Sequence, residues 1–206
     1  IQPYYQLVRT LGSFLSQFIN EGIKEISITY GGDSFDYDTS ILTKALVSGF
    51  FKGRVDVNVN EVNALLYAKE RSITVGEKIS NEAHGYSSSV TVKVVGETKK
   101  MEVKATYIKE YGPRIFAIND FKIDFYPEGH ILYIQHHDRP GVIGVVGKKL
   151  GDLNLNIATM QVGRKEAGGE AIMVLTFDDP LPSDIPNELL STLEISEATL
   201  IELPLC

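Results

Sequence analysis

From residue 130 onward, strand-like and helix-like segments follow one another in an order that few folds can accommodate. Runs of β-branched and apolar residues indicate strands, and apolar residues at helical spacing indicate two helices. Gly151 follows Lys148 and Lys149, which is typical of the C-terminal end of a helix. We therefore expect strand, helix, strand, strand, helix and strand, over residues 130–136, 142–150, 156–164, 171–177, 184–193 and 195–203.

The part before this block mixes helices and strands. Helical spacing runs over residues 4–18, and a second helix is expected over 41–51. Alternating valines predict a strand at 90–94, which returns over 101–108. A strand is expected over 24–30, and residues 55–59 suggest a short strand or an extended lead-in. Residues 61–71 look helical and 72–79 extended, and 114–118 and 122–126 look like a hairpin around 119–120.

Pro127-Glu128-Gly129 is the clearest domain boundary, because Pro and Gly interrupt regular structure. We predict an α+β chain: a mixed α/β domain over residues 1–128, followed by a ferredoxin-like βαββαβ domain over 129–206. This order does not define the function, since many unrelated activities share it.

The composition and the charge limit which kinds of binding partner and which cellular compartment we expect. The net charge is −7, and eleven of the acidic residues against five of the basic ones lie from residue 130 onward. No basic stripe is present, so we expect no nucleic-acid partner. The single cysteine, Cys206, allows no disulfide within the chain, which favours the cytoplasm. No apolar run approaches the ~20 residues that span a bilayer, so we expect no membrane partner, and no signal peptide is recognised.

No residue pattern indicates a reaction centre. A dinucleotide-binding turn has its glycines before a helix, whereas Gly144, Gly147 and Gly151 lie inside or at the end of one. His136 and His137 are adjacent on a strand and point to opposite faces, so they cannot easily share a metal ion. We therefore predict no catalytic residues, no metal site and no cofactor in this chain.

The segment Asp138-Arg139-Pro140-Gly141-Val142 predicts a ligand site instead. The Asp138 carboxylate can accept an ammonium group, and the free N–H groups where the helix begins, at Gly141 and Val142, can bind a carboxylate. Asn156, where the next strand begins, and His136 complete a polar ledge at one end of a sheet. Such a ledge suits a small zwitterion.

Each of these residues also has a purely structural interpretation. His136 could be an exposed histidine at a strand end, Asp138 could cap the helix, and Asn156 could be a turn residue. A helix cap alone would explain Asp138.

Arg114 and Lys122 are candidates for a second, anion-binding site, and the alternative interpretation is a solvated hairpin edge. A two-residue turn between their strands would put them on opposite faces. A three-residue loop over 119–121 would pair Arg114 with Tyr126 and place all three side chains on one face. The absence of Gly from the turn favours the longer loop.

Two sets of motifs carry a family resemblance. The Asp138–Val142 segment followed by Asn156-Ile157 resembles an ACT domain, an amino-acid-sensing module. The motifs over 160–164 and 170–174 resemble the C-terminal ACT domain of D-3-phosphoglycerate dehydrogenase. Residues 3–128 resemble the intervening, allosteric-substrate-binding domain of its long form, in the motifs over 11–13, 28–32, 42–45 and 59–64.

The resemblance implies a regulatory region of an NAD-dependent oxidoreductase that starts L-serine synthesis. The catalytic and NAD-binding residues would lie outside this chain, which begins at Ile1 and is expected to be a piece of a longer protein. The region would bind L-serine, or another small amino acid, as a feedback effector. It would also form a homodimer or tetramer through the ACT domain.

The family's serine site maps onto Asp138, His136 and an Asn156 supplied by a neighbouring subunit. Its anion site maps onto Arg114 and Lys122, while Tyr126 stands where an arginine can occur. Two other identities remain open: a regulatory part of an L-serine dehydratase, and a free-standing ACT-type module that binds an amino acid.

Overall fold

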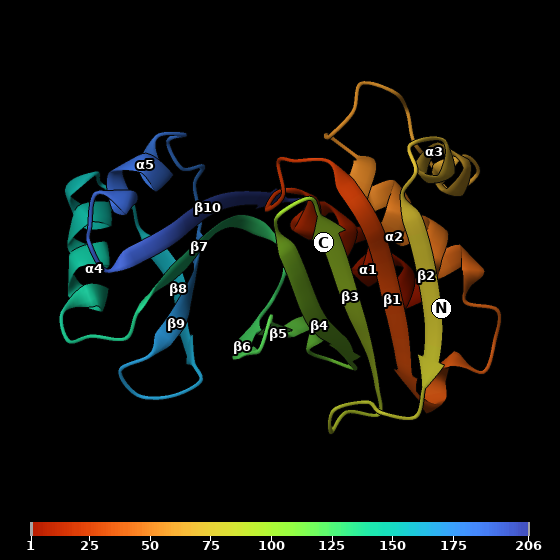
Figure 1. The fold of residues 1–206 in the computed structure, drawn as a ribbon. Helices are drawn as coiled ribbons and strands as arrows, with labels where there is room; N and C mark the ends of the chain where they lie inside the picture. Colours follow the sequence, from red (N-terminus) through yellow and green to blue (C-terminus); the bar gives the residue numbers. More distant parts are fainter. Residues whose placement is uncertain (1, 206) are drawn as a thin grey trace. The chain divides into compact units, whose positions relative to one another are not determined.

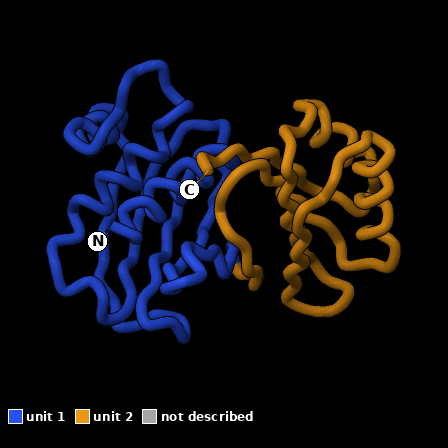
Figure 2. Tube along the Cα trace, turned by 180° about the vertical axis from the view of Figure 1, so that it is seen from behind, with its two compact units in different colours: residues 1–119 blue, residues 120–206 orange. Residues whose placement is uncertain are grey.

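The computed structural model describes residues 2–205, which fold into two compact units, 1–119 and 120–206 (Figure 2). The division falls between Asn119 and Asp120, whereas the Pro-Glu-Gly motif places the domain boundary after Glu128. The difference arises from β6 (Phe121–Phe125), which contacts β8 (Ile157–Arg164) and so belongs to the second unit.

Unit 1 contains one twisted sheet with helices on one face (Figure 1). Its strands lie in the order β2-β1-β3-β4-β5, with β1 and β2 parallel and the other neighbours antiparallel. The helices α1 (Gln2–Ser16) and α2 (Ser40–Phe51) pack against each other. The remaining elements are β1 (Ile23–Gly32), η1 (Asp33–Phe35), α3 (Ala64–Glu70), β2 (Thr74–Ser80), β3 (Ser88–Gly96), β4 (Lys100–Ile108) and β5 (Gly112–Ile118).

The core of unit 1 follows from the two periodicities in its sequence. Apolar residues at helical spacing in α1 are buried, and alternate residues of β1 and β3 face them. The helices approach closely at two glycines: a Cβ on Gly12 would lie 2.2 Å from the Leu46 carbonyl oxygen, and one on Gly49 would lie 2.1 Å from that of Arg9. Glycine at both positions therefore permits backbone contact between α1 and α2.

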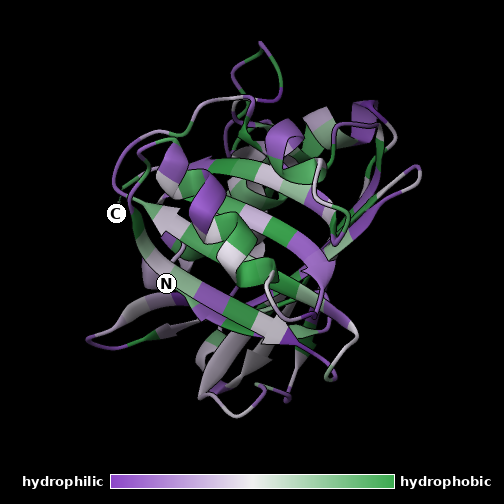
Figure 3. Ribbon diagram, turned by 90° about the vertical axis from the view of Figure 1, so that its left-hand side faces the viewer, coloured by the Kyte–Doolittle hydropathy of each residue, from purple (hydrophilic) through white to green (hydrophobic). Residues whose placement is uncertain are grey.

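Unit 2 has the predicted ferredoxin-like order, so the α+β class is confirmed. Its four-stranded sheet runs β10-β7-β9-β8, with antiparallel neighbours throughout. The two helices share a core with one face of this sheet, and Figure 3 shows hydrophobic and hydrophilic residues intermixed along its strands and helices. The elements are β7 (Gly129–His137), α4 (Val142–Asp152), β8, β9 (Glu170–Phe177), α5 (Ile185–Leu190) and β10 (Ile195–Leu203).

Two local expectations were wrong. The alternating valines over 55–59 do not form a strand; Val59 is buried and its carbonyl accepts a hydrogen bond from Ser48 on α2, so the segment packs on that helix. The loop between β5 and β6 has two residues, Asn119 and Asp120, and not three. Asn119 has φ of 51°, so it adopts the left-handed conformation that we had expected only of a glycine.

Candidate functional site

The loop after β7 is attached to the β8–β9 hairpin through Asp138. One carboxylate oxygen, Oδ2, accepts a hydrogen bond from Arg164 Nη1 at 2.9 Å and another from the Gly168 N–H at 3.1 Å. The Asp138 N–H donates to the Gly169 carbonyl at 2.8 Å. The Arg164 hydrogen bond, followed by that of Gly168, holds the pKa of the Asp138 carboxyl below its ordinary value, so this group stays ionised at neutral pH.

His136 lies beside this carboxylate, and its electrostatic interaction with Asp138 contributes to the same lowering of the pKa. It pairs with Ala171 on β9, and Ala171 also pairs with Arg164 on β8. Alternation along β7 puts His136 on the same face as Leu132 and Ile134, which belong to the core shared with the helices. His136, Ala171 and Arg164 therefore form one row across three strands, on the helix-covered face.

The interpretation of His136 as an exposed strand-end residue was wrong, because its exposed fraction is 2%. Its Nδ1 lies 2.9 Å from the carbonyl oxygen of His137. Its Nε2 is buried and has no hydrogen-bond partner among residues 2–205. Buried polar groups in proteins are nearly always paired, so this nitrogen is a candidate for contact with a ligand.

The helix α4 begins next to these residues. Its N-cap is Gly141, with φ of 92°, and no side chain caps it, so the alternative interpretation of Asp138 as a helix cap is wrong. Val142 is buried, whereas Gly141 and Gly144 are exposed, and a Cβ on either glycine would meet nothing within 4 Å. The Val142 N–H donates to the Arg139 carbonyl at 3.4 Å, so the expectation that this group is free was wrong. The N–H groups of Ile143 and Gly144 lack acceptors within the helix and lie at its positive dipole end, so they can receive an anion.

Asn156 does not lie at this end of the sheet in the same chain. It precedes Ile157, which pairs with Phe177 on β9, whereas His136 pairs with Ala171 on the same strand. Since antiparallel strands rise about 3.4 Å per residue, the two ends are about 20 Å apart. A single ledge within one chain was therefore wrong, and Asn156 could join Asp138 only from another copy of the chain.

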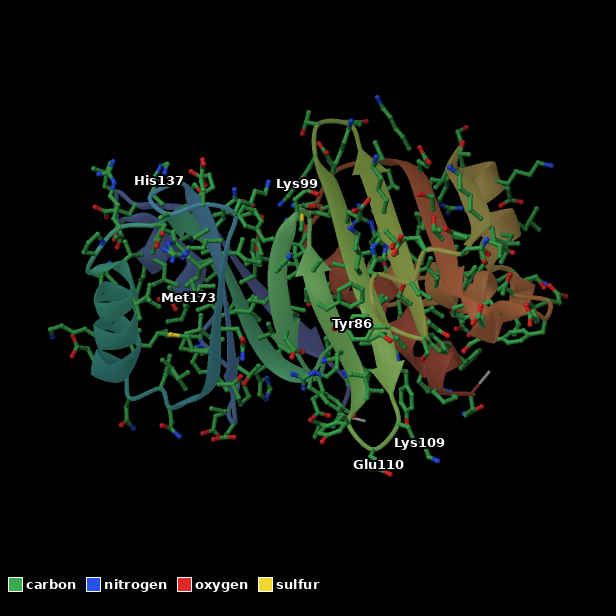
Figure 4. All side chains as sticks on the ribbon, turned by 90° about the horizontal axis from the view of Figure 1, so that it is seen from below. Tyr86, Lys99, Lys109, Glu110, His137 and Met173 are labelled. Carbon is green, nitrogen blue, oxygen red and sulfur yellow. The ribbon has the colours of Figure 1, made fainter. Side chains whose placement is uncertain are left out.

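Two charged residues near Asp138, His137 and Lys165, form ion pairs with other residues. His137 points to the opposite face, as predicted, and its Nδ1 lies 2.8 Å from Glu170 Oε1; Figure 4 shows His137 among the side chains of unit 2. Lys165 follows Arg164 on the hairpin, but it pairs with Asp120 at 3.7 Å and lies over the Phe121 ring.

In the part of the chain that is described, no cluster of three or more His, Cys, Asp or Glu could hold a metal ion.

The residues of the predicted anion site fall in different units. Arg114 lies half-buried on β5 in unit 1, whereas Lys122 is exposed on β6 and Tyr126 follows β6 in unit 2. The two-residue turn between the strands removes the argument that favoured a common face. Their grouping into one site therefore stays a prediction.

Arg164 is the residue of this site that we did not predict from the sequence. It appeared only as part of a family motif, without a role. The detectable signal was its register, because a hairpin loop over 165–169 places Arg164 opposite the first residues of β9. Those residues in turn pair with the end of β7, where Asp138 follows.

Comparison with known proteins identifies both parts of the chain. Residues 1–119 match the model for the D-3-phosphoglycerate dehydrogenase intervening domain, and residues 130–192 match the ACT domain. A D-3-phosphoglycerate dehydrogenase of Bacillus subtilis is 52% identical over 204 residues, which cover 99% of this chain and 39% of that protein.

More distant relatives carry the same protein name. Proteins of the same name from Synechocystis and Methanocaldococcus jannaschii are 35% and 32% identical, each over 98% of this chain and over 37% and 38% of their own lengths. The chain therefore spans less than two fifths of these relatives. No helix within residues 2–205 is both long and apolar enough to cross a membrane.

Proposed function

Because the chain belongs to the family of the D-3-phosphoglycerate dehydrogenase intervening domain and continues into an ACT domain, we propose that it regulates such a dehydrogenase. In this proposal it binds L-serine as a feedback effector and joins subunits together. The observation that carries the proposal is the ionised Asp138 beside the buried, unpaired Nε2 of His136 where α4 begins.

Each of these groups can bind a different part of the serine molecule. Both hydrogen bonds that the Asp138 carboxylate makes among residues 2–205 use Oδ2, so Oδ1 can accept the ammonium group. The first-turn N–H groups of α4 can bind the carboxylate. The His136 Nε2 can pair with the hydroxyl group. A buried group that hydrogen-bonds a ligand hydroxyl discriminates strongly against the analogue that lacks it.

Asn156 requires a second copy of the chain. The strand β8 is at an edge of its sheet, and an unpaired edge is a template for pairing with another strand. If two β8 strands pair antiparallel about the point between Met160 and Gln161, Ile157 of one copy lies opposite Arg164 of the other. Asn156 of the partner subunit then lies beside Asp138, so a two-fold dimer completes two identical sites.

Calorimetric titration with L-serine and L-alanine tests this function. We expect serine to bind in the millimolar range or tighter and to bind more tightly than alanine, because alanine leaves His136 Nε2 unpaired. Equal affinities for serine and alanine would show that His136 does not contact the hydroxyl group of the ligand. Absence of heat and of any thermal stabilisation with serine would exclude the proposed effector.

The activity of the whole protein is part of the proposal. The relatives named above are dehydrogenases, which favours this assignment over an L-serine dehydratase or a free-standing sensor. The parent protein would be a cytoplasmic oxidoreductase whose NAD-binding and catalytic residues lie outside these 206 residues. An anionic second ligand at Arg114, Lys122 and Tyr126 also remains a proposal.

A further inference from the structure

Arg164 places a positive charge at the end of the sheet where the ammonium group of the proposed ligand would bind. Its Nη1 lies 2.9 Å from Asp138 Oδ2, and the two side chains are 56% and 25% exposed. An ammonium group at Oδ1 of the same carboxylate would lie a few ångströms from this guanidinium. Like charges at such a distance repel.

We infer that Arg164 is a specificity-determining residue that admits ligands with a free carboxylate and rejects simple amines. The inference rests on the proposed function and names the chemical class that the site selects. A carboxylate bound between the guanidinium and the first turn of α4 would cancel the repulsion. A ligand without one would leave two cations facing each other, which is a repulsive element of selectivity.

The guanidinium can contact a ligand without releasing Asp138. One nitrogen, Nη1, bonds to Asp138, whereas a guanidinium carries five N–H donors in a planar fork that matches a carboxylate. Its position is maintained because the hairpin is held at two further points, where Gly168 donates to Asp138 and Gly169 accepts from it. Arg164 thus has donors left for a carboxylate beside α4.

The test combines a change in the ligand with a change in the protein. L-serinamide keeps the ammonium and hydroxyl groups of serine but carries an amide in place of the carboxylate. Both ligands are titrated calorimetrically into the 206-residue chain at about pH 6.5, where α-amino groups are protonated. The wild type and the Arg164→Gln, Arg164→Lys and Lys165→Gln variants are compared, and thermal melting confirms that each variant is folded.

We expect the wild type to prefer serine by about tenfold or more, as for loss of a charge-assisted hydrogen bond. Arg164→Gln should weaken the binding of serine by a similar factor. It should leave the affinity for serinamide unchanged or raise it, since Asp138 is then free of its cation. Arg164→Lys should restore part of the preference through its charge. Lys165→Gln removes the same charge from the same hairpin and should leave the preference unchanged.

The outcomes separate the inference from the proposed function. If Arg164→Gln weakens both ligands by the same factor, Arg164 only positions Asp138, and the inference is overturned while the serine site stands. If the wild type binds both ligands equally, the same conclusion follows. If the wild type binds neither ligand, the proposed function fails, and the inference fails with it.

Discussion

His136 on β7 and Arg164 on β8 pair with the same residue of β9, Ala171. Their side chains therefore stand in one row on the helix-covered face, with the small, buried Ala171 between them. Asp138, one residue beyond the end of β7, brings a carboxylate to the same place. The register of three strands thus assembles an imidazole, a guanidinium and a carboxylate where α4 begins.

Replacing Asp138 with alanine should weaken L-serine binding by about tenfold or more, because a charge-assisted hydrogen bond to the ammonium group is lost. Asp152→Ala is the matched control, because Asp152 pairs with Lys148 at the far end of α4. Calorimetric titration of both variants measures the effect. Unchanged serine affinity in Asp138→Ala would remove this residue from the site.

Replacing His136 with leucine should stabilise the free protein while it impairs ligand selection. The buried Nε2 lacks a partner, and an unsatisfied buried polar group costs about 1–3 kcal/mol. Urea denaturation should show a gain of about 1 kcal/mol, and titration should show that serine no longer binds more tightly than alanine. Retention of the serine preference would mean that another group binds the hydroxyl.

The contribution of the Asp138–Arg164 pair to stability should depend on pH in a definite direction. The pKa of Asp138 is lowered in the folded protein, chiefly by the Arg164 hydrogen bond. The contribution is therefore complete above the pKa of an unfolded Asp, about 3.9, and is lost as the pH falls through the lower folded value. Arg164→Gln should consequently lower the unfolding free energy at neutral pH. The loss should be smaller at pH values below the pKa of Asp138 in both the unfolded and the folded protein.

Urea denaturation of the wild type and Arg164→Gln across this range checks the sign. A difference in unfolding free energy that stays constant from neutral to strongly acidic pH would contradict the role of this ion pair. The carboxyl ¹³C resonance of Asp138 offers an independent measurement, because its titration midpoint should rise in Arg164→Gln.

Replacing Gly12 with alanine should destabilise unit 1. The added Cβ would lie 2.2 Å from the Leu46 carbonyl oxygen, so α1 and α2 must separate. We expect a loss of about 2 kcal/mol or more in urea denaturation, as for an overpacked core. Gly147→Ala is the control: this glycine of α4 has open space around it, and alanine there should add about 0.5–1 kcal/mol. Equal effects would contradict the close approach of the helices.

Periodicity predicted the α+β class and the element order of unit 2, because buried faces impose a period of two on strands and 3.6 on helices. It did not predict which residues meet across the sheet. Asp138 follows the end of β7 and Asn156 precedes the start of β8, and these two strands run parallel on either side of β9, so the two residues lie at opposite ends of the sheet. The predicted ferredoxin-like order already implies this separation, which the proposal of a single ledge overlooked.

Contacts between distant segments, which local patterns do not record, explain the residue that was missed and the element that was wrong. Arg164 acquires its partner only through the pairing of β7, β8 and β9. The valines over 55–59 alternate as in a strand, but packing of Val59 on α2 overrides that local preference.

The central claim is that two copies of the chain share each amino-acid site. Asp138→Ala and Asn156→Ala should each weaken serine binding when tested alone, since every site in either homodimer lacks one contact. Mixing the two variants under exchange should restore binding, because each heterodimer regains one site with both residues. With random pairing, calorimetry should find about one restored site per four chains. If the mixture binds no more serine than the separate variants while the wild type binds it, the site is not shared between copies.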